Sequence, residues 1–175
     1  MIIKNKIIID DDWLILRPAE GEELERVVVP AGKVIVPLKV WQAQRNELKS
    51  RAELGVWLAS HERPEELKRE IEMFSVIAVD FPKFADGRGY SIAYNLRARL
   101  GYAGELRAVG DVLRDQMFYM QRVGFDSFAP RPDKSIHDAL QGLSDFSDSY
   151  QAAIDQKIPL FRRVKRDGVR LRTSK

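Results

Sequence analysis

The chain has 175 residues and a mass of 20.1 kDa, the size of one domain with at most a small appendage. With 45% hydrophobic and 31% charged residues, it has the composition of a globular protein. It contains no cysteine, which excludes disulfides, thiolate nucleophiles and cysteine-ligated iron–sulfur or zinc sites. Since His61 and His137 are the only histidines, we do not expect a histidine-rich metal site either.

The net charge of +3 is distributed unevenly along the chain. Residues 157–175 carry eight basic residues and one aspartate, a net charge of +7, whereas residues 1–156 carry 21 basic and 25 acidic residues, a net charge of −4. A basic segment can contact an acidic partner or nucleic acid, and the alternative is a solvated terminus. Because the segment has no aromatic residue beyond Phe161 and belongs to no known recognition module, we do not expect nucleic-acid binding.

The apolar stretch near the amino terminus does not have the length of a targeting or membrane segment. Residues 7–9 are three isoleucines, and three aspartates follow them directly. This run is too short for the core of a signal peptide or for a membrane span. We therefore expect a cytoplasmic protein without a membrane partner.

The first 32 residues are predicted to form β-structure. The runs 7–9 and 13–16 flank the three aspartates, which we interpret as the tip of a hairpin, and a third run at 27–29 ends at Pro30. We interpret Ala31 and Gly32 as the connection between this β-structure and the rest of the chain. The predicted organisation is an N-terminal β appendage at 1–32, an α/β domain at 33–156 and a basic C-terminal tail at 157–175.

From residue 33 onward, short continuous apolar runs alternate with segments of helical periodicity. Apolar runs without polar alternation suit strands that are covered on both faces, and the alternation favours right-handed βαβ units. We therefore expect an α/β fold with about five mostly parallel strands flanked by helices. A flavodoxin-like strand order is the preferred arrangement, and a half-barrel arc of βα units is the alternative. The expected strands begin at Val34, Val56, Val76, Leu106 and Ser127.

The helices between these strands have recognisable ends. Pro64, followed by two glutamates, predicts a helix start, because proline at the first position loses no hydrogen bond and carboxylates favour this end. Gly101 is expected to close the next helix, and Gly124 the one after it. We expect Asp111 to cap the start of that later helix.

One βα unit is longer than its neighbours. Successive expected strands begin 22, 20, 30 and 21 residues apart, and the additional residues lie in the segment 80–91. Connections in α/β units usually take about two to six residues, and longer ones are often functional. This segment also leaves the carboxyl end of a strand, which is the edge where open parallel sheets bind ligands.

The composition of this long loop suggests a binding site for an anion or a partner. Gly87 and Gly89 permit close backbone approach and unusual dihedral angles. A helix that starts at Tyr90 and Ser91 would direct free N–H groups toward the loop, which favours anions. The alternative is a purely structural loop whose charged residues form surface ion pairs.

Charged residues complete the predicted site. Lys83 and Arg88 supply positive charge, and aspartates can accept protons or orient the basic residues. The charged residues that follow the expected strands at Leu106 and Ser127 belong to the same site if those strands lie side by side in the sheet. The full predicted set is Asp80, Lys83, Asp86, Gly87, Arg88, Gly89, Tyr90, Ser91, Asp111, Arg114, Asp115 and Arg131.

No catalytic, cofactor or metal motif accompanies this set. The two loop glycines lack the third glycine of a dinucleotide fingerprint and follow their strand too late. The sequence contains no phosphate-binding P-loop, no serine nucleophile elbow and no His-Glu zinc motif. We therefore assign no catalytic residue, no metal and no cofactor from the sequence.

Four segments in the second half of the chain carry a family resemblance. They are 80–84 (DFPKF), 86–91 (DGRGYS), 104–116 (GELRAVGDVLRDQ) and 123–126 (VGFD). Together they resemble the bacterial domain of unknown function 934 family, over about residues 41–161. Members of this family are commonly encoded beside assimilatory sulfite reductase and are labelled as oxidoreductases of sulfite reduction. The resemblance implies a role in sulfate assimilation and cysteine biosynthesis.

Two functional hypotheses follow from this resemblance. In the first, the protein is a non-catalytic accessory partner of sulfite reductase and the long loop is an interface. In the second, it is an oxidoreductase that holds a small sulfur oxyanion with Arg88, Arg114, Lys83 and Arg131. Arginine suits oxyanions because its planar fork donates two parallel hydrogen bonds. The second hypothesis requires a bound or partner-supplied cofactor to provide electrons.

Overall fold

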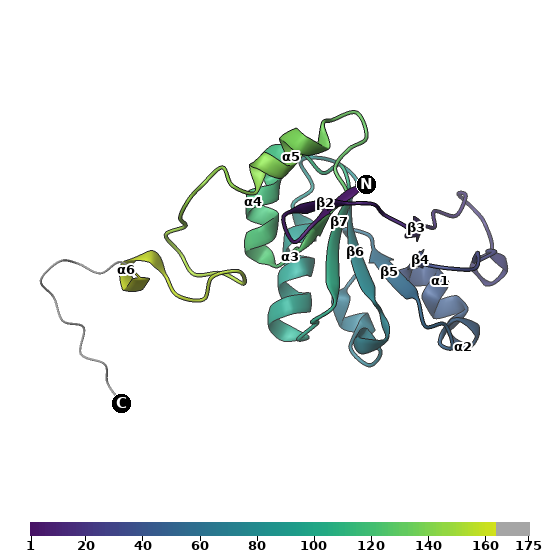
Figure 1. Cartoon of the computed structure of the whole chain (residues 1–175). Coiled ribbons are helices and arrows are strands. Elements are labelled where there is room, and N and C mark those ends of the chain that lie inside the picture. Colours follow the sequence, from purple (N-terminus) through teal and green to yellow (C-terminus); the bar gives the residue numbers. More distant parts are fainter. Residues whose placement is uncertain (164–175) are drawn as a thin grey trace, which may run out of the picture.

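The computed structural model describes residues 1–163 and is built around one curled eight-stranded sheet flanked by helices (Figure 1). The strand order is β2-β1-β8-β7-β6-β5-β4-β3. The strands are β1 (Ile2–Lys4), β2 (Ile7–Ile9), β3 (Leu14–Ile15), β4 (Val34–Pro37), β5 (Leu54–Leu58), β6 (Val76–Phe81), β7 (Glu105–Gly110) and β8 (Ser127–Phe128).

The parallel strands follow one another in chain order from β3 to β8. Each right-handed crossover therefore leaves its helix on the same face of the sheet, and the sheet curls into a half-barrel. The predicted α/β class and the half-barrel alternative are confirmed. The flavodoxin-like order is wrong, since a doubly wound sheet reverses its strand order partway across. The five predicted strands correspond to β4–β8, and the first 15 residues add three more.

The helical elements are short. Among residues 1–163, no helix has the length and apolar character needed to cross a membrane. The α-helices are α1 (Leu38–Ala43), α2 (Arg45–Leu48), α3 (Arg88–Tyr94), α4 (Arg114–Val123), α5 (Ile136–Gly142) and α6 (Leu160–Arg163); a π-helical turn, η4 (Asn95–Arg99), continues α3, and 3-10 turns form η1 (Leu24–Arg26), η2 (Pro64–Leu67) and η3 (Ile71–Met73).

The N-terminal region differs from its prediction. The hairpin joins β1 to β2, and its tip is Asn5–Lys6, both with positive φ, rather than the three aspartates. The run at 13–16 instead supplies β3, which pairs in parallel with β4. The valines at 27–29 form no strand, and Pro64 begins a 3-10 turn instead of an α-helix. Residues 1–32 thus contribute strands to both edges of the main sheet.

The main core lies between the sheet and its helices. The strand side chains Val36, Val56 and Ile77 are fully buried there, and Leu96 and Met117 cover them from the helical side. Fully burying one side chain of this size is worth about 1.5–3 kcal/mol. The segments of helical periodicity in the sequence therefore supply apolar side chains that cover this side of the sheet.

The opposite face of the sheet is crossed by the segment 10–13, which runs from β2 at one edge to β3 at the other (Figure 1). Beneath this segment, Arg107 of β7 is only 1% exposed. Its Nη1 donates to both carboxylate oxygens of Asp11 at 3.0 Å, and its Nε donates to Glu105 Oε1 at 2.8 Å. Lys4 Nζ donates to the other oxygen of Glu105 at 2.6 Å. A buried guanidinium needs such partners, because an unpaired buried charge is very costly.

The carboxylate of Glu105 responds to two opposing influences. Burial raises its pKa, but the hydrogen bond from Lys4 and the charge of Arg107 outweigh that effect. The pKa of Glu105 therefore lies below its ordinary value of 4.5. A carboxyl whose pKa is lowered on folding stabilises the native state above its unfolded pKa, and this contribution is lost as the pH falls through the folded pKa.

Replacing Arg107 by methionine is expected to lower the free energy of unfolding by about 3 kcal/mol, because Glu105 and Asp11 lose their shared cation. Urea denaturation monitored by circular dichroism measures this change. The matched control is Lys33→Met, which removes the exposed ion pair of Lys33 with Asp12 and should have a much smaller effect, because solvent screens that pair. Equal effects of the two substitutions would contradict the importance assigned to Arg107.

The same cluster predicts a pH dependence. The stability difference between the wild-type protein and Glu105→Gln should be largest above about pH 5 and should shrink as the pH falls from 4.5 through the lower pKa of folded Glu105. Below that pKa, both proteins carry a neutral side chain at this position. Urea titrations at a series of pH values provide the measurement. A difference that grows toward acidic pH would show that the pKa of Glu105 is raised.

Candidate functional site

The carboxyl edge of the sheet brings together residues from four strand ends. Asp80 lies near the end of β6, Asp111 follows β7, Arg131 follows β8, and Arg17 follows β3. Arg131 Nη1 donates to Asp111 Oδ1 at 3.1 Å, and Arg17 Nη2 donates to Asp80 Oδ1 at 2.6 Å. The predicted convergence thus holds for Asp111 and Arg131, and Asp80 lies at the same edge.

Arg17 is a member of this edge that the sequence analysis missed. Its guanidinium lies 5.1 Å from the ring centroid of Trp57, whose Nε1 donates to the carbonyl oxygen of Leu16 at 2.9 Å. Next to this group, Gly110 has φ +91°, and a Cβ there would lie 2.5 Å from the Phe81 carbonyl oxygen. Glycine is therefore required where the backbone passes Asp80.

The long loop is held by its own hydrogen bonds. Asp111 Oδ2 accepts from the Phe84 backbone N–H at 2.7 Å, and Asp86 binds Arg88 through Nε at 2.9 Å and Nη2 at 2.6 Å. Hydrogen bonds from Arg88 and Ser60 hold the pKa of Asp86 far below its ordinary value. Lys83 is exposed and makes no ion pair with any residue in the described part of the chain.

The expected cap at Asp111 is wrong. Helix α4 begins at Arg114. The N–H of Leu113, the residue just before the helix, donates to Gln116 Oε1 at 3.1 Å. Asp111 lies too early in the chain to cap this helix and instead joins the loop to Arg131. The side chain therefore stabilises tertiary structure rather than a helix end.

The two loop glycines have ordinary backbone angles. Gly87 has φ −80°, and Gly89 does not have positive φ, so neither uses the unusual dihedral angles that we expected. Helix α3 begins at Arg88, before Tyr90 and Ser91. A Cβ on Gly89 would lie 2.6 Å from the ring of Phe81, so this glycine allows α3 to approach β6 closely.

Arg114 and Asp115 face a different neighbour. Arg114 donates to Asp138 at 2.6 Å and to Asp145 at 2.9 Å, on and just beyond α5. Both residues line a hollow of about 300 Å³ between the start of α4 and α5. The charge of Arg114 is thus directed toward α5, whereas Asp115 also lies close enough to Tyr90 of the long loop to add to the effect of burial in raising the pKa of that tyrosine.

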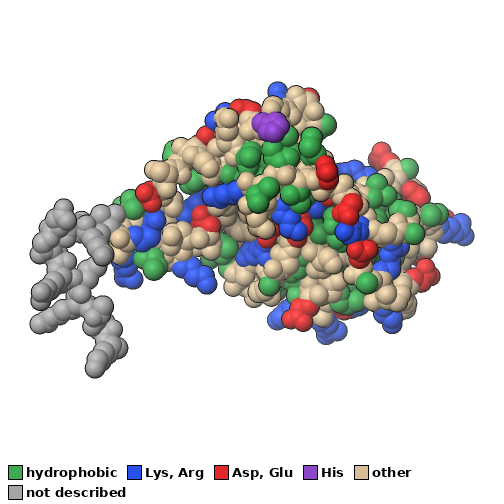
Figure 2. All heavy atoms as spheres, in the orientation of Figure 1, with side chains coloured by type: hydrophobic (Ala, Val, Ile, Leu, Met, Phe, Trp, Pro, Cys, Tyr) green, Lys and Arg blue, Asp and Glu red, His purple; other side chains and the backbone are tan. Residues whose placement is uncertain are grey.

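The arginines expected to hold an oxyanion are therefore already engaged. Arg88, Arg114 and Arg131 each donate to at least one aspartate. On the face shown in Figure 2, basic and acidic side chains are interspersed. A sulfur oxyanion at this edge would have to compete with carboxylates for the same donors. In addition, no three acidic or histidine side chains within residues 1–163 are placed to hold a metal ion together.

Tyr90 and Ser91 open instead onto a groove of about 360 Å³ between α3 and α4. Tyr94 and Tyr119 line this groove with 46% and 57% of their surface exposed, and the exposed Arg99 also lines it. The rings of Tyr90 and Tyr119 meet edge to face, with centroids 5.1 Å apart. We call this surface the tyrosine groove. The sequence analysis missed Tyr119, although an aromatic residue on the helix that was predicted to end at Gly124 was an available signal.

Comparison with known proteins identifies the family. Residues 55–161 match the family described as "Bacterial protein of unknown function (DUF934)". The chain belongs to the DUF934 family. The matched part runs from β5 to α6 and includes both the carboxyl-edge aspartates and the tyrosine groove, whereas Arg17 lies outside it. No curated protein and no solved structure matches the chain.

Replacing Asp111 by alanine should loosen the long loop, because Phe84 N–H loses its acceptor and Arg131 loses one of its two carboxylates. We expect the amide hydrogen of Phe84 to exchange at least about tenfold faster, consistent with the loss of roughly 1.4 kcal/mol of local stability. The control is Asp133→Ala, which removes the other partner of Arg131 and leaves Phe84 unchanged. Unaltered exchange at Phe84 in Asp111→Ala would contradict this role.

Proposed function

We propose that this DUF934 protein is a cytoplasmic, non-catalytic partner of assimilatory sulfite reductase and that it docks through the tyrosine groove. The observation that carries the docking surface is the exposure of Tyr94 and Tyr119 beside Arg99. Tyrosine and arginine dominate the energetic centres of protein interfaces, because they bury a large area while keeping polar groups at the tip.

The groove has features of a prepared interface. The ring of Tyr90 is half-buried and packs against both Phe81 and Tyr119, so Tyr119 is held before any partner arrives. A side chain that is already ordered loses less conformational entropy on binding, which leaves more of the contact energy for affinity. Tyr119 is therefore the side chain expected to contribute most.

The connection to sulfite reduction is supported by the family resemblance in the segments at 80–84, 86–91, 104–116 and 123–126. The net charge of +7 in residues 157–175 supports an acidic partner surface, since complementary charge accelerates association. Residues 164–175 of that segment lie outside the described structure.

The oxyanion hypothesis has weaker support from the same geometry. The three arginines that it needs donate to aspartates of this chain, as described above. An anion would gain only the difference between two charge-assisted interactions. Docking is therefore better supported than anion binding, because Tyr94 and Tyr119 are exposed whereas these arginines are already paired.

Purified DUF934 protein and assimilatory sulfite reductase should co-elute in size-exclusion chromatography at low salt. Tyr119→Ser should weaken their association at least about tenfold in biolayer interferometry, which corresponds to the 1.4 kcal/mol or more expected of an interface centre. Val28→Ser is the matched control, because Val28 is an exposed hydrophobic residue outside the groove.

Two results would overturn the proposal. One is the absence of any association between the proteins at micromolar concentration and low salt. The other is calorimetric binding of sulfite by the isolated protein that is lost in Arg131→Gln, which would establish the oxyanion hypothesis in its place. An association that Tyr119→Ser leaves unchanged would retain the partner but remove the tyrosine groove as its site.

A further inference from the structure

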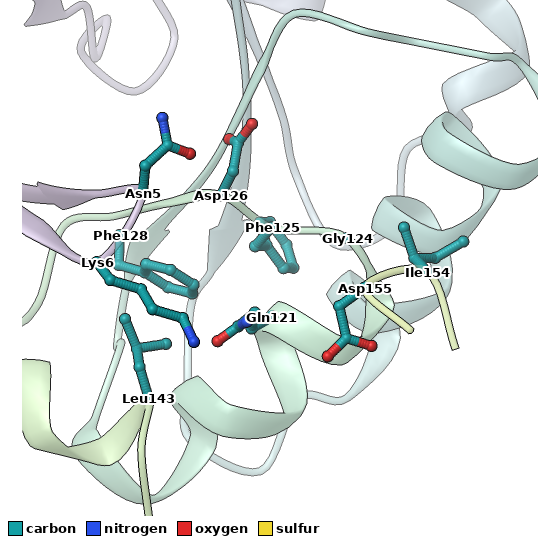
Figure 3. A pocket seen from close by; sticks show the side chains of 10 residues that line it. All are labelled: Asn5, Lys6, Gln121, Gly124, Phe125, Asp126, Phe128, Leu143, Ile154 and Asp155. Atoms are coloured by element: carbon teal, nitrogen blue, oxygen red, sulfur yellow. The ribbon is translucent and has the colours of Figure 1, made fainter. Parts of the chain in front are cut away.

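Another concave site lies at the amino end of β8, away from the edge that carries Asp80 and Asp111. It is a cavity of about 380 Å³ between the β1–β2 turn, the end of α4 and the segment that follows α5 (Figure 3). Phe125 and Phe128, which are 2% and 1% exposed, form its floor, and Leu143 and Ile154 add apolar walls. Pockets of this size with a mostly apolar lining and a few polar groups are typical of small-molecule sites.

One polar atom in this cavity lacks a partner. Gln121 Oε1 is buried and receives no hydrogen bond from any residue in the described part of the chain. The Gln121 amide points into the cavity beside the ring of Phe128 (Figure 3). A buried acceptor left without a donor costs about 1–3 kcal/mol, so a donor on an occupant would recover that free energy.

The two acidic side chains that line the cavity, Asp126 and Asp155, are each paired with an arginine. Asp155 receives a hydrogen bond from Arg122 Nη1 at 2.8 Å, and Asp126 receives one from Arg97 Nη2 at 2.8 Å. Lys6, in contrast, forms no ion pair with any carboxylate of residues 1–163. Its ammonium group reaches past Phe128 toward Gln121 (Figure 3). The occupant that complements these charges carries one negative group.

The cavity also continues along the chain surface. A smaller hollow of about 200 Å³ shares Lys6, Gln121, Leu143 and Asp155 with it. Lys6 therefore lies between the apolar cavity and a more polar hollow. An anionic group bound to Lys6 can remain partly hydrated while an apolar ring contacts Phe125 and Phe128.

We propose that this cavity binds a small aromatic carboxylic acid that carries an N–H or O–H donor. The ring packs on Phe125 and Phe128, the donor binds Gln121 Oε1, and the carboxylate pairs with Lys6. The site lies apart from the tyrosine groove and does not depend on the proposed docking function.

Indole-3-propionate is a suitable probe, because it combines an aromatic ring, an N–H donor and a carboxylate. Isothermal titration calorimetry with the full-length protein should give a dissociation constant below about 1 mM, a realistic affinity for a compound of this size. In ¹H–¹⁵N spectra, the side-chain amide of Gln121 should shift on titration.

Two matched compounds separate the polar contacts. 1-Methylindole-3-propionate lacks the donor, and indole-3-propionamide lacks the negative charge. Each should bind about tenfold more weakly than indole-3-propionate, as expected from the loss of one hydrogen bond to a buried acceptor or of one partly buried ion pair.

Two matched variants complete the test. In Gln121→Met, indole-3-propionate and its 1-methyl derivative should bind equally, and in Lys6→Met, the acid and the amide should bind equally. Lys39→Met, on the exposed side of α1, should change nothing. The proposal is overturned if indole-3-propionate neither releases heat nor shifts the Gln121 amide at millimolar concentration. It is equally overturned if all three compounds bind alike to the wild-type protein and to both variants.

Discussion

The pairing of the buried Arg107 with Asp11 and Glu105 is the interaction on which the arrangement of the N-terminal segment depends. A guanidinium that is 1% exposed on a sheet strand requires carboxylates on both sides. Glu105 comes from the same strand, but Asp11 is supplied by the segment between β2 and β3, which must cross the sheet to reach it. The ion pair therefore holds the segment between the two edge strands, β2 and β3, against the middle of the sheet. Residues 1–15 thus become part of the main fold.

The same crossing sets the electrostatics of the carboxyl edge. Once β3 is in place beside β4, the chain that follows it delivers Arg17 to Asp80 and to the ring of Trp57. Asp80 is then neutralised from within the molecule, as Asp86 and Asp111 are by their own arginines. The surfaces that retain unmet binding capacity lie elsewhere: exposed aromatic rings in the tyrosine groove, and Lys6 with Gln121 at the amino end of β8.

The sequence predicts those features that depend on local periodicity. Continuous apolar runs predict β4–β8 because both faces of these strands are buried, and the interval of 30 residues locates the long loop. It does not predict contacts between distant positions, such as Asp11 with Arg107, 96 residues apart, or Arg17 with Asp80, 63 residues apart. Nor does the sequence show that Asp111 binds the long loop instead of a helix end, because a carboxylate can accept hydrogen bonds from backbone N–H groups in either place.

Helix α4 carries side chains for three different surfaces. Met117 and Met120 are fully buried against the sheet, Tyr119 lines the tyrosine groove, and Gln121 lines the cavity at β8. This division follows from the helical period, which turns residues only one or two positions apart toward different sides. The two buried methionines fix the rotation of the helix, so the groove and the cavity share one rigid support. Binding at one surface can then influence the other only by moving α4, and any such coupling must be reciprocal.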